Sequence, residues 1–251
     1  MAGLIAAVML ATPAVADISI PAGGSIALNG ATVDLGCTDV IVSGTFSLDT
    51  GSLVNVRNVS ILPGGVVNAG SSQITLGGDW SNTGSFNAGT SRVNFVDAPT
   101  CAPSSTISGN TSFHTLSLTS TIGKVYRFAV GSTQQILYQL TITGMPGTPI
   151  QLRSTVAGQT ANINLTAFQT MHDIAVNDLV ATGVWLAPYL VNQAPGGSAL
   201  RWFGEPDYAR IPTLGTTSLF ALILLIFGFA YRARRANAGC QFNGKDSKHV
   251  S

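Results

Sequence analysis

The sequence predicts an all-β fold for residues 17–204, and more specifically a right-handed parallel β-helix. The chain of 251 residues holds 28 glycines and only 9% charged residues. This composition disfavours long amphipathic helices and suits short strands joined by tight turns. Apolar and polar residues alternate along many short segments, and a glycine pattern recurs every 20 residues, which is about the length of one solenoid coil.

The expected strands follow from the alternation, because a period of two places neighbouring side chains on opposite faces of a strand. The clearest segments lie at residues 40–42, 74–76, 93–95, 116–118, 140–142 and 163–165. A glycine-rich chain can also remain disordered, but alternation repeated over so many segments argues against that alternative.

The repeat is clearest in three successive motifs. Residues 44–46 (GTF), 64–66 (GGV) and 84–86 (GSF) are each followed by a second glycine, at Gly51, Gly70 and Gly89, and then by an extended segment. Stacked coils bury an apolar column inside a solenoid. We therefore expect Phe46, Val66 and Phe86 to lie above one another.

Two corners of the coils are also expected to be equivalent. Residues 68–70 and 87–89 both read Asn-Ala-Gly, and glycine and asparagine permit the left-handed backbone conformation of a sharp bend. A β-sandwich with accidental glycine spacing is the alternative fold, because the period blurs after Asp97.

An open solenoid exposes strand edges at both ends and needs caps. Residues 18–35 and 185–203 are the expected caps. Trp185, Trp202 and Phe203 supply large apolar side chains for this purpose, and stacking against sugars is their alternative role.

One internal stretch resembles a known group of proteins. Residues 78–91 (GDWSNTGSFNAGTS) are similar to a phrase of bacterial surface proteins with filamentous-haemagglutinin-like or pectin-lyase-like β-helices. Further matching phrases stand at residues 107–113 (ISGNTSF), 140–144 (LTITG) and 149–154 (PIQLRS), so the resemblance covers roughly residues 40–178. It implies a scaffold and names no reaction.

The N-terminus indicates export. Residues 4–11 form a short apolar segment, and Ala14 and Ala16 fit the small-residue rule for cleavage by signal peptidase. Residues 1–16 are therefore predicted to be a signal peptide, with a hydrophobic N-terminal strand as the alternative. No Lys or Arg precedes the apolar segment, so we expect translation to start upstream of Met1.

The C-terminal part predicts a single membrane span. Residues 214–231 carry no charge and would form a helix of about 27 Å, close to the hydrocarbon thickness of a bilayer. Arg232, Arg234 and Arg235 follow at once, which predicts that the basic tail, residues 232–251, stays in the cytoplasm. A buried helix of a soluble domain and a plain stop-transfer anchor are the alternatives.

The four residues Ile211, Pro212, Thr213 and Leu214, with the apolar segment and the arginines, resemble the IPTL-CTERM sorting signal of Gram-negative bacteria, a relative of the PEP-CTERM signal. The resemblance covers about 25 residues. It implies that a membrane-embedded exosortase cuts near this motif, within residues 205–213, which are expected to form the linker and the sorting motif. The inner membrane would then hold the protein only until it is processed and passed to the cell surface or the extracellular space.

Cysteine usage fits an exported domain. Cys37 and Cys101 lie in that domain and Cys240 in the tail. An oxidising periplasm would let the first two pair and stabilise the fold by about 3 to 4 kcal/mol in the chain-entropy model. Two separately buried thiols are the alternative.

The exported part is not expected to bind nucleic acid. Residues 17–210 carry seven basic and ten acidic side chains, a net charge of −3, so the +1 of the whole chain comes from the tail. Nucleic-acid binding needs basic side chains that attract the phosphate backbone, and this composition does not favour such a surface.

No sequence motif for catalysis, a metal or a cofactor is visible. We expect His114 to be a solvated side chain that points away from the side bearing Phe113. His172 and Asp173, with Asn177 and Asp178, form the densest polar cluster, but the two aspartates differ by an odd offset. The remaining candidates, Lys124, Arg127, Asp34, Asp39 and Asp49, are spread along the chain.

Two functions remain after these exclusions. The first is a noncatalytic surface or extracellular-matrix protein, with adhesion as one role and with glycans or matrix as partners. The second is a β-helical carbohydrate-active enzyme, a polysaccharide lyase or hydrolase, which requires carboxylates or bases gathered along one groove.

Overall fold

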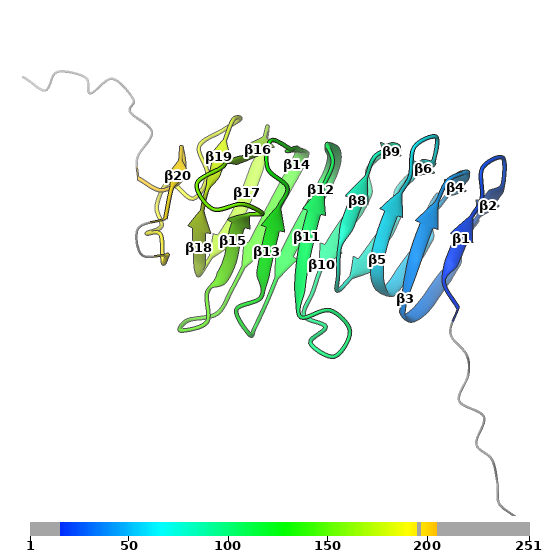
Figure 1. Cartoon of the computed structure of the whole chain (residues 1–251), viewed down its shortest axis with the longest axis horizontal. Coiled ribbons are helices and arrows are strands. Elements are labelled where there is room, and N and C mark those ends of the chain that lie inside the picture. The colour runs from blue at the N-terminus through cyan, green and yellow to red at the C-terminus, as the bar shows by residue number, and fades with distance from the viewer. Residues whose placement is uncertain (1–15, 195–196, 205–251) are drawn as a thin grey trace, which may run out of the picture. The chain divides into compact units, whose positions relative to one another are not determined.

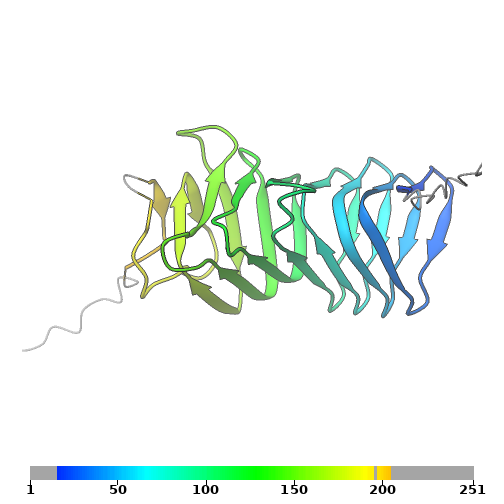
Figure 2. The same cartoon turned by 90° about the horizontal axis from the view of Figure 1, so that it is seen from below.

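The computed structural model describes residues 16–194 and 197–204 of the chain. These residues form twenty strands and no helix, and the strands wind into a parallel β-solenoid of about nine turns. Figure 1 shows the strands as successive rungs from β1 to β20, and Figure 2 shows the same stack turned by 90°. The predicted all-β parallel solenoid is confirmed.

The strands form three stacks, which are the faces of the solenoid. The first stack holds β1 (Ile18–Ile20), the ends of β3 (Thr32–Val42) and β5 (Ser52–Ile61), β8 (Trp80–Asn82), β11 (Ser104–Ser108), β13 (Val125–Phe128), β15 (Ile150–Ser154) and β18 (Ile174–Asn177).

The second stack lies on the next face. It holds β2 (Ser25–Ala27), β4 (Thr45–Ser47), β6 (Val66–Asn68) and β9 (Ser85–Asn87), and further along the solenoid the beginnings of β12 (Thr111–Thr119) and β14 (Thr133–Thr143), then β16 (Ala161–Leu165), β19 (Leu179–Ala181) and β20 (Ala199–Leu200).

The third stack holds the beginnings of β3 and β5, then β7 (Gln73–Leu76), β10 (Arg92–Phe95), the ends of β12 and β14, and β17 (Phe168–His172). Long strands such as β5 and β12 bend around a corner and so belong to two stacks. Every pairing between named strands is parallel. The alternative β-sandwich is therefore wrong, because such sandwiches are built from antiparallel sheets.

The apolar column differs from the prediction by one residue in its middle turn. Phe46 pairs with Val67, and Val67 pairs with Phe86, so Val67 and not Val66 completes the buried column. The glycine that stacks beneath Gly84 is Gly65, whose main-chain oxygen a Cβ at Gly84 would strike. The middle turn is thus shifted by one residue against the strict spacing of 20.

The Asn-Ala-Gly corners are equivalent, as expected. Asn68 pairs with Asn87, and the Asn87 side chain donates to Oδ1 of Asn68 at 2.8 Å. Gly70 and Gly89 follow with positive φ values of 58° and 55°. This left-handed conformation explains why glycine stands at both positions.

Aromatic residues link the two halves of the core. The ring centroid of Trp80 lies 5.0 Å from that of Phe86 and 5.3 Å from that of Phe113. All three rings are buried, and the Phe86 and Phe113 centroids are 5.9 Å apart. Phe113 therefore continues the column of Phe46, Val67 and Phe86 into the later turns.

The two ends of the solenoid are built differently. Residues 18–35 form the first turn itself, with Ile20 and Leu35 buried in the common core. At the other end, Trp202 is buried and forms a bridge with Leu186. The Trp185 indole N–H donates to the main-chain oxygen of Phe203 at 3.0 Å. These contacts support the predicted capping role of the C-terminal aromatic residues.

Substitutions at Val66 and Val67 test the shifted register. We expect Val67→Thr to lower the free energy of unfolding by about 1 to 2 kcal/mol, because it buries a hydroxyl group in the column. Val66→Thr, on the half-buried outer side, should cost less than about 0.5 kcal/mol. Urea unfolding of the two purified variants measures the difference, and a larger loss for Val66→Thr would contradict the register.

Candidate functional site

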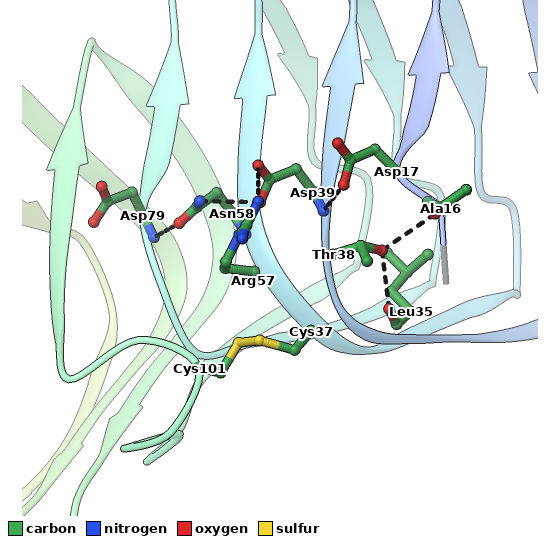
Figure 3. A network of polar contacts seen from close by, with 10 residues as sticks. All are labelled: Ala16, Asp17, Leu35, Cys37, Thr38, Asp39, Arg57, Asn58, Asp79 and Cys101. Carbon is green, nitrogen blue, oxygen red and sulfur yellow. Dashed lines mark hydrogen bonds and ion pairs between the residues drawn. A yellow bond between two sulfur atoms is a disulfide. The ribbon is translucent and has the colours of Figure 1, made fainter. Parts of the chain in front are cut away.

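A ladder of polar side chains runs along one edge of the solenoid between successive turns (Figure 3). Asp17 Oδ1 accepts the main-chain N–H of Asp39 at 2.8 Å, and Asp39 Oδ1 accepts that of Asn58 at 3.2 Å. Asn58 Oδ1 then accepts the N–H of Asp79 at 2.7 Å, and Asp79 Oδ1 accepts that of Thr106 at 2.6 Å. Each side chain thus bonds the backbone of the next turn.

The charge of Asp39 is balanced within this ladder. Arg57 donates to both carboxylate oxygens, Nε at 2.8 Å and Nη2 at 2.7 Å. The hydrogen bond from Arg57 lowers the pKa of Asp39 below its ordinary value. Asn58 adds a side-chain hydrogen bond at 3.0 Å. Asp39 is held in its ionised form as part of the corner.

Most carboxylates of the described residues have a similar structural task. Six of the eight aspartates accept a main-chain N–H, namely Asp17, Asp34, Asp39, Asp79, Asp97 and Asp178. Two hydrogen bonds lower the pKa of Asp34. The larger effect comes from the main-chain N–H of Gly36 and the smaller from the side chain of Asn55. A general acid at neutral pH requires the opposite shift. In residues 16–194 and 197–204, no three His, Cys, Asp or Glu side chains are placed to hold a metal ion.

Sequence reasoning missed the ladder, although a signal for it exists. Asp39, Asn58 and Asp79 follow their predecessors in the ladder by 22, 19 and 21 residues, close to the coil length. The last step, to Thr106, takes 27 residues because a longer loop intervenes. A search for Asx residues at the coil period would have found the first steps.

The disulfide links the loop between β10 and β11 to β3 in the early turns. Cys37 and Cys101 are bonded across a sequence separation of 64 residues, with their Cα atoms 5.9 Å apart. The Cys101 N–H also donates to the Ala98 oxygen at 2.9 Å. In the chain-entropy model, closing a loop of this length stabilises the fold by about 4 kcal/mol.

Lys124 is a buried residue and does not line an exposed groove. The residue is 3% exposed, and its ammonium group donates to the main-chain oxygens of Gly77 and Val96. The group also lies 5.4 Å from the ring centroid of Tyr126. Burial lowers the pKa of Lys124 to about 8. The carbonyl contacts indicate that Lys124 holds the backbone after β7 and β10.

The polar cluster of residues 172–178 is divided between two corners. Asp173 precedes β18 and accepts a hydrogen bond from the Gln193 amide at 3.2 Å. Asp178 follows β18 and accepts the Gly158 N–H at 3.0 Å. Both have left-handed backbone conformations. The odd offset predicts that the two aspartates lie on opposite faces of one strand, whereas the structure places them outside β18, at the corners before and after it.

His114 points outward, as the strand alternation predicts, but it has aromatic neighbours. Its ring stacks on that of Tyr138, with centroids 5.1 Å apart and an angle of 17° between the planes. Phe168 follows, with its centroid 5.4 Å from that of Tyr138. We call His114, Tyr138 and Phe168 the aromatic strip. Sequence reasoning missed it, because the three residues come from separate turns.

The proposed processing signals lie mainly outside the described residues. This applies to Ala14, to the motif Ile211, Pro212, Thr213 and Leu214, to the span 214–231, and to Arg232, Arg234 and Arg235. In the part of the chain that the structure describes, no helix is long and apolar enough to span a membrane. Comparison of the chain with protein-family models, with curated proteins and with solved structures finds no match.

Two variants separate the ladder from the ion pair at its centre. Asp39→Ala should lower the free energy of unfolding by about 2 to 3 kcal/mol, because it leaves main-chain and guanidinium donors without their acceptor. Arg57→Gln removes only a half-exposed ion pair and should cost less than about 1 kcal/mol. Urea unfolding at neutral pH measures both losses.

The pH dependence gives a control for this comparison. Because the folded pKa of Asp39 lies below the ordinary value of 3.8, its contribution is present above that pH and is lost as pH falls through the folded pKa. Asp39→Ala should therefore weaken the acid destabilisation. Equal losses for Asp39→Ala and Arg57→Gln would show that the ion pair, and not the ladder, stabilises the corner.

Proposed function

We propose that the chain is a noncatalytic exported protein of the cell surface or extracellular matrix, with its solenoid, a right-handed parallel β-helix, as the scaffold. One observation carries this proposal: six of the eight aspartates in the described residues, the kind of side chain that a polysaccharide lyase or hydrolase would use, accept hydrogen bonds from main-chain N–H groups. Side chains committed to holding successive turns together are poor acids and bases, since protonating them costs stability.

Residues 1–16 would direct export and would be removed by signal peptidase. Asp17 is the first residue of the polar ladder, and β1 starts immediately after it. Cleavage after Ala16 would leave the ladder complete and would remove the hydrogen bond that the Thr38 hydroxyl donates to the Ala16 oxygen at 3.3 Å. The Cys37–Cys101 disulfide suits the oxidising compartment that export implies.

Sorting would use the C-terminal region. In this proposal residues 214–231 span the inner membrane, and Arg232, Arg234 and Arg235 keep the tail cytoplasmic. An exosortase then cuts near the motif of Ile211, Pro212, Thr213 and Leu214, and residues 205–213 form the linker and the sorting motif. The support is the order of motif, apolar segment and arginines in the sequence.

Expression in a host with and without its exosortase tests the sorting step. A tag placed between residues 205 and 210 reports the mass and location of the product. We expect a shorter product at the surface or in the medium when the enzyme is present, and a membrane-bound product with the intact C-terminus when it is absent.

Replacement of residues 211–214 by alanines serves as the matched control in the same host. This variant should remain membrane-bound, because the apolar segment and the arginines are unchanged. Identical full-length, membrane-bound protein in both hosts would refute the sorting proposal.

A further inference from the structure

The last turn of the solenoid carries much exposed apolar surface. Tyr189 is 89% exposed, Val191 82% and Leu200 64%, and these are the three most exposed large hydrophobic side chains in residues 16–194 and 197–204. Val184, at the start of this turn, is 37% exposed. We call Val184, Tyr189, Val191 and Leu200 the apolar collar.

The collar lies at the C-terminal end of the stack. Leu200 belongs to β20, which is the last strand in the order of its sheet and stands at the opposite end from β1 in Figure 1. The segment with Tyr189 and Val191 passes over β18, since the Gln193 N–H donates to the main-chain oxygen of Ile174 at 3.1 Å. The collar residues therefore belong to the turn that closes the solenoid at this end.

Hydrogen bonds fix the backbone of this turn to the turn before it. Asn192 accepts the main-chain N–H of Val176 and donates to the oxygen of the same residue, both at 2.9 Å. Gln169 donates to the main-chain oxygen of Trp185 and accepts the N–H of Ala187, both at 2.8 Å. The exposed collar side chains are thus presented by a backbone with specific partners.

The absence of a following turn does not by itself account for the collar. In the first turn, residues 18–35, the exposed large hydrophobic side chain is Ile26 alone, at 39%. The C-terminal end is also poor in charge, because residues 182–194 and 197–204 carry one charged side chain, Arg201. The two ends therefore differ in chemistry, and the C-terminal one suits an apolar environment.

We propose that the apolar collar docks end-on onto the lipid surface of the inner membrane, with its side chains in the headgroup region. This inference rests on the proposed function, because it requires residues 214–231 to span that membrane. Nine residues, 205–213, separate the collar turn from the span, and fully extended they reach about 30 Å. The collar is therefore kept near the bilayer at a high effective concentration, so weak insertion suffices.

An end-on approach also accounts for collar residues that lie on different stacks. Amphipathic surfaces enter the boundary between headgroups and acyl chains by about 5 to 10 Å, and successive turns are about 4.8 Å apart. One or two turns would enter, so side chains on every face of the last turn would leave water together. Tyr189 suits this depth, because its ring is apolar and its hydroxyl can stay hydrated.

A fluorescent reporter on the full-length chain in phosphatidylcholine vesicles tests the docking. Cys240→Ser removes the cysteine outside the disulfide, and the environment-sensitive fluorophore NBD is attached at Val191→Cys. The matched control carries NBD at Ile122→Cys, an exposed position in the loop between β12 and β13. We expect blue-shifted emission at position 191, and quenching by nitroxide-labelled lipid in both leaflets about twofold or more stronger than at position 122.

Adding Tyr189→Ser and Leu200→Ser should lower the quenching at position 191 to the level at position 122. Both side chains are exposed, so urea unfolding should show that this variant folds as the parent does. Unchanged quenching at position 191 in this variant would show that the collar does not hold the solenoid on the lipid.

Extraction of the vesicles with alkaline carbonate separates failure of the docking from failure of the proposed function. Equal quenching at positions 191 and 122 in a chain that resists extraction would overturn the docking and leave the membrane span standing. Release of the chain by carbonate would overturn both. A blue shift at position 191 that nitroxide-labelled lipid does not quench would assign the collar to a second copy of the chain, and would also overturn the docking.

Discussion

Main-chain hydrogen bonding between successive turns is the interaction on which the rest of the structure depends. Each turn donates to and accepts from its neighbours, so strands must lie in parallel register and corners must repeat at nearly constant positions. The close approach of turns also restricts side chains. A Cβ at Gly65 would collide with the main-chain oxygen of Val42, which explains why glycine stands at this bend.

The same constraint accounts for how the few charges are used. Where a corner leaves a main-chain N–H without a strand partner, an Asx side chain of the preceding turn accepts it, as Asp39 does for Asn58. Lys124 has the converse role, because its buried ammonium group donates to a main-chain oxygen, that of Val96. Tyr138 and Phe168 are exposed aromatic side chains that these contacts between turns do not use.

Much of the fold could be predicted from the sequence, because the alternation and the glycine spacing both reflect the stacking of turns. The Asn-Ala-Gly corners agree with the glycine spacing, and the Cys37–Cys101 disulfide agrees with the pairing expected for an exported domain. The middle turn was misaligned by one residue, since Gly64 and Gly65 are adjacent and spacing alone does not distinguish them. The polar ladder was missed because its members are about 20 positions apart in the sequence and become neighbours only when the turns stack. The aromatic strip depends on a bulge at Leu137 and Tyr138, and regular alternation contains no signal for a bulge.

The central claim is that side chains of one turn hold the main chain of the next at the polar corner. Amide hydrogen exchange measured by NMR on the purified protein tests it most directly. The amides of Asn58, Asp79 and Thr106 should exchange about a hundredfold or more slowly than those of the exposed turns at Gly64 and Gly147. Exchange of the three corner amides at the rate of those turn amides would contradict the account.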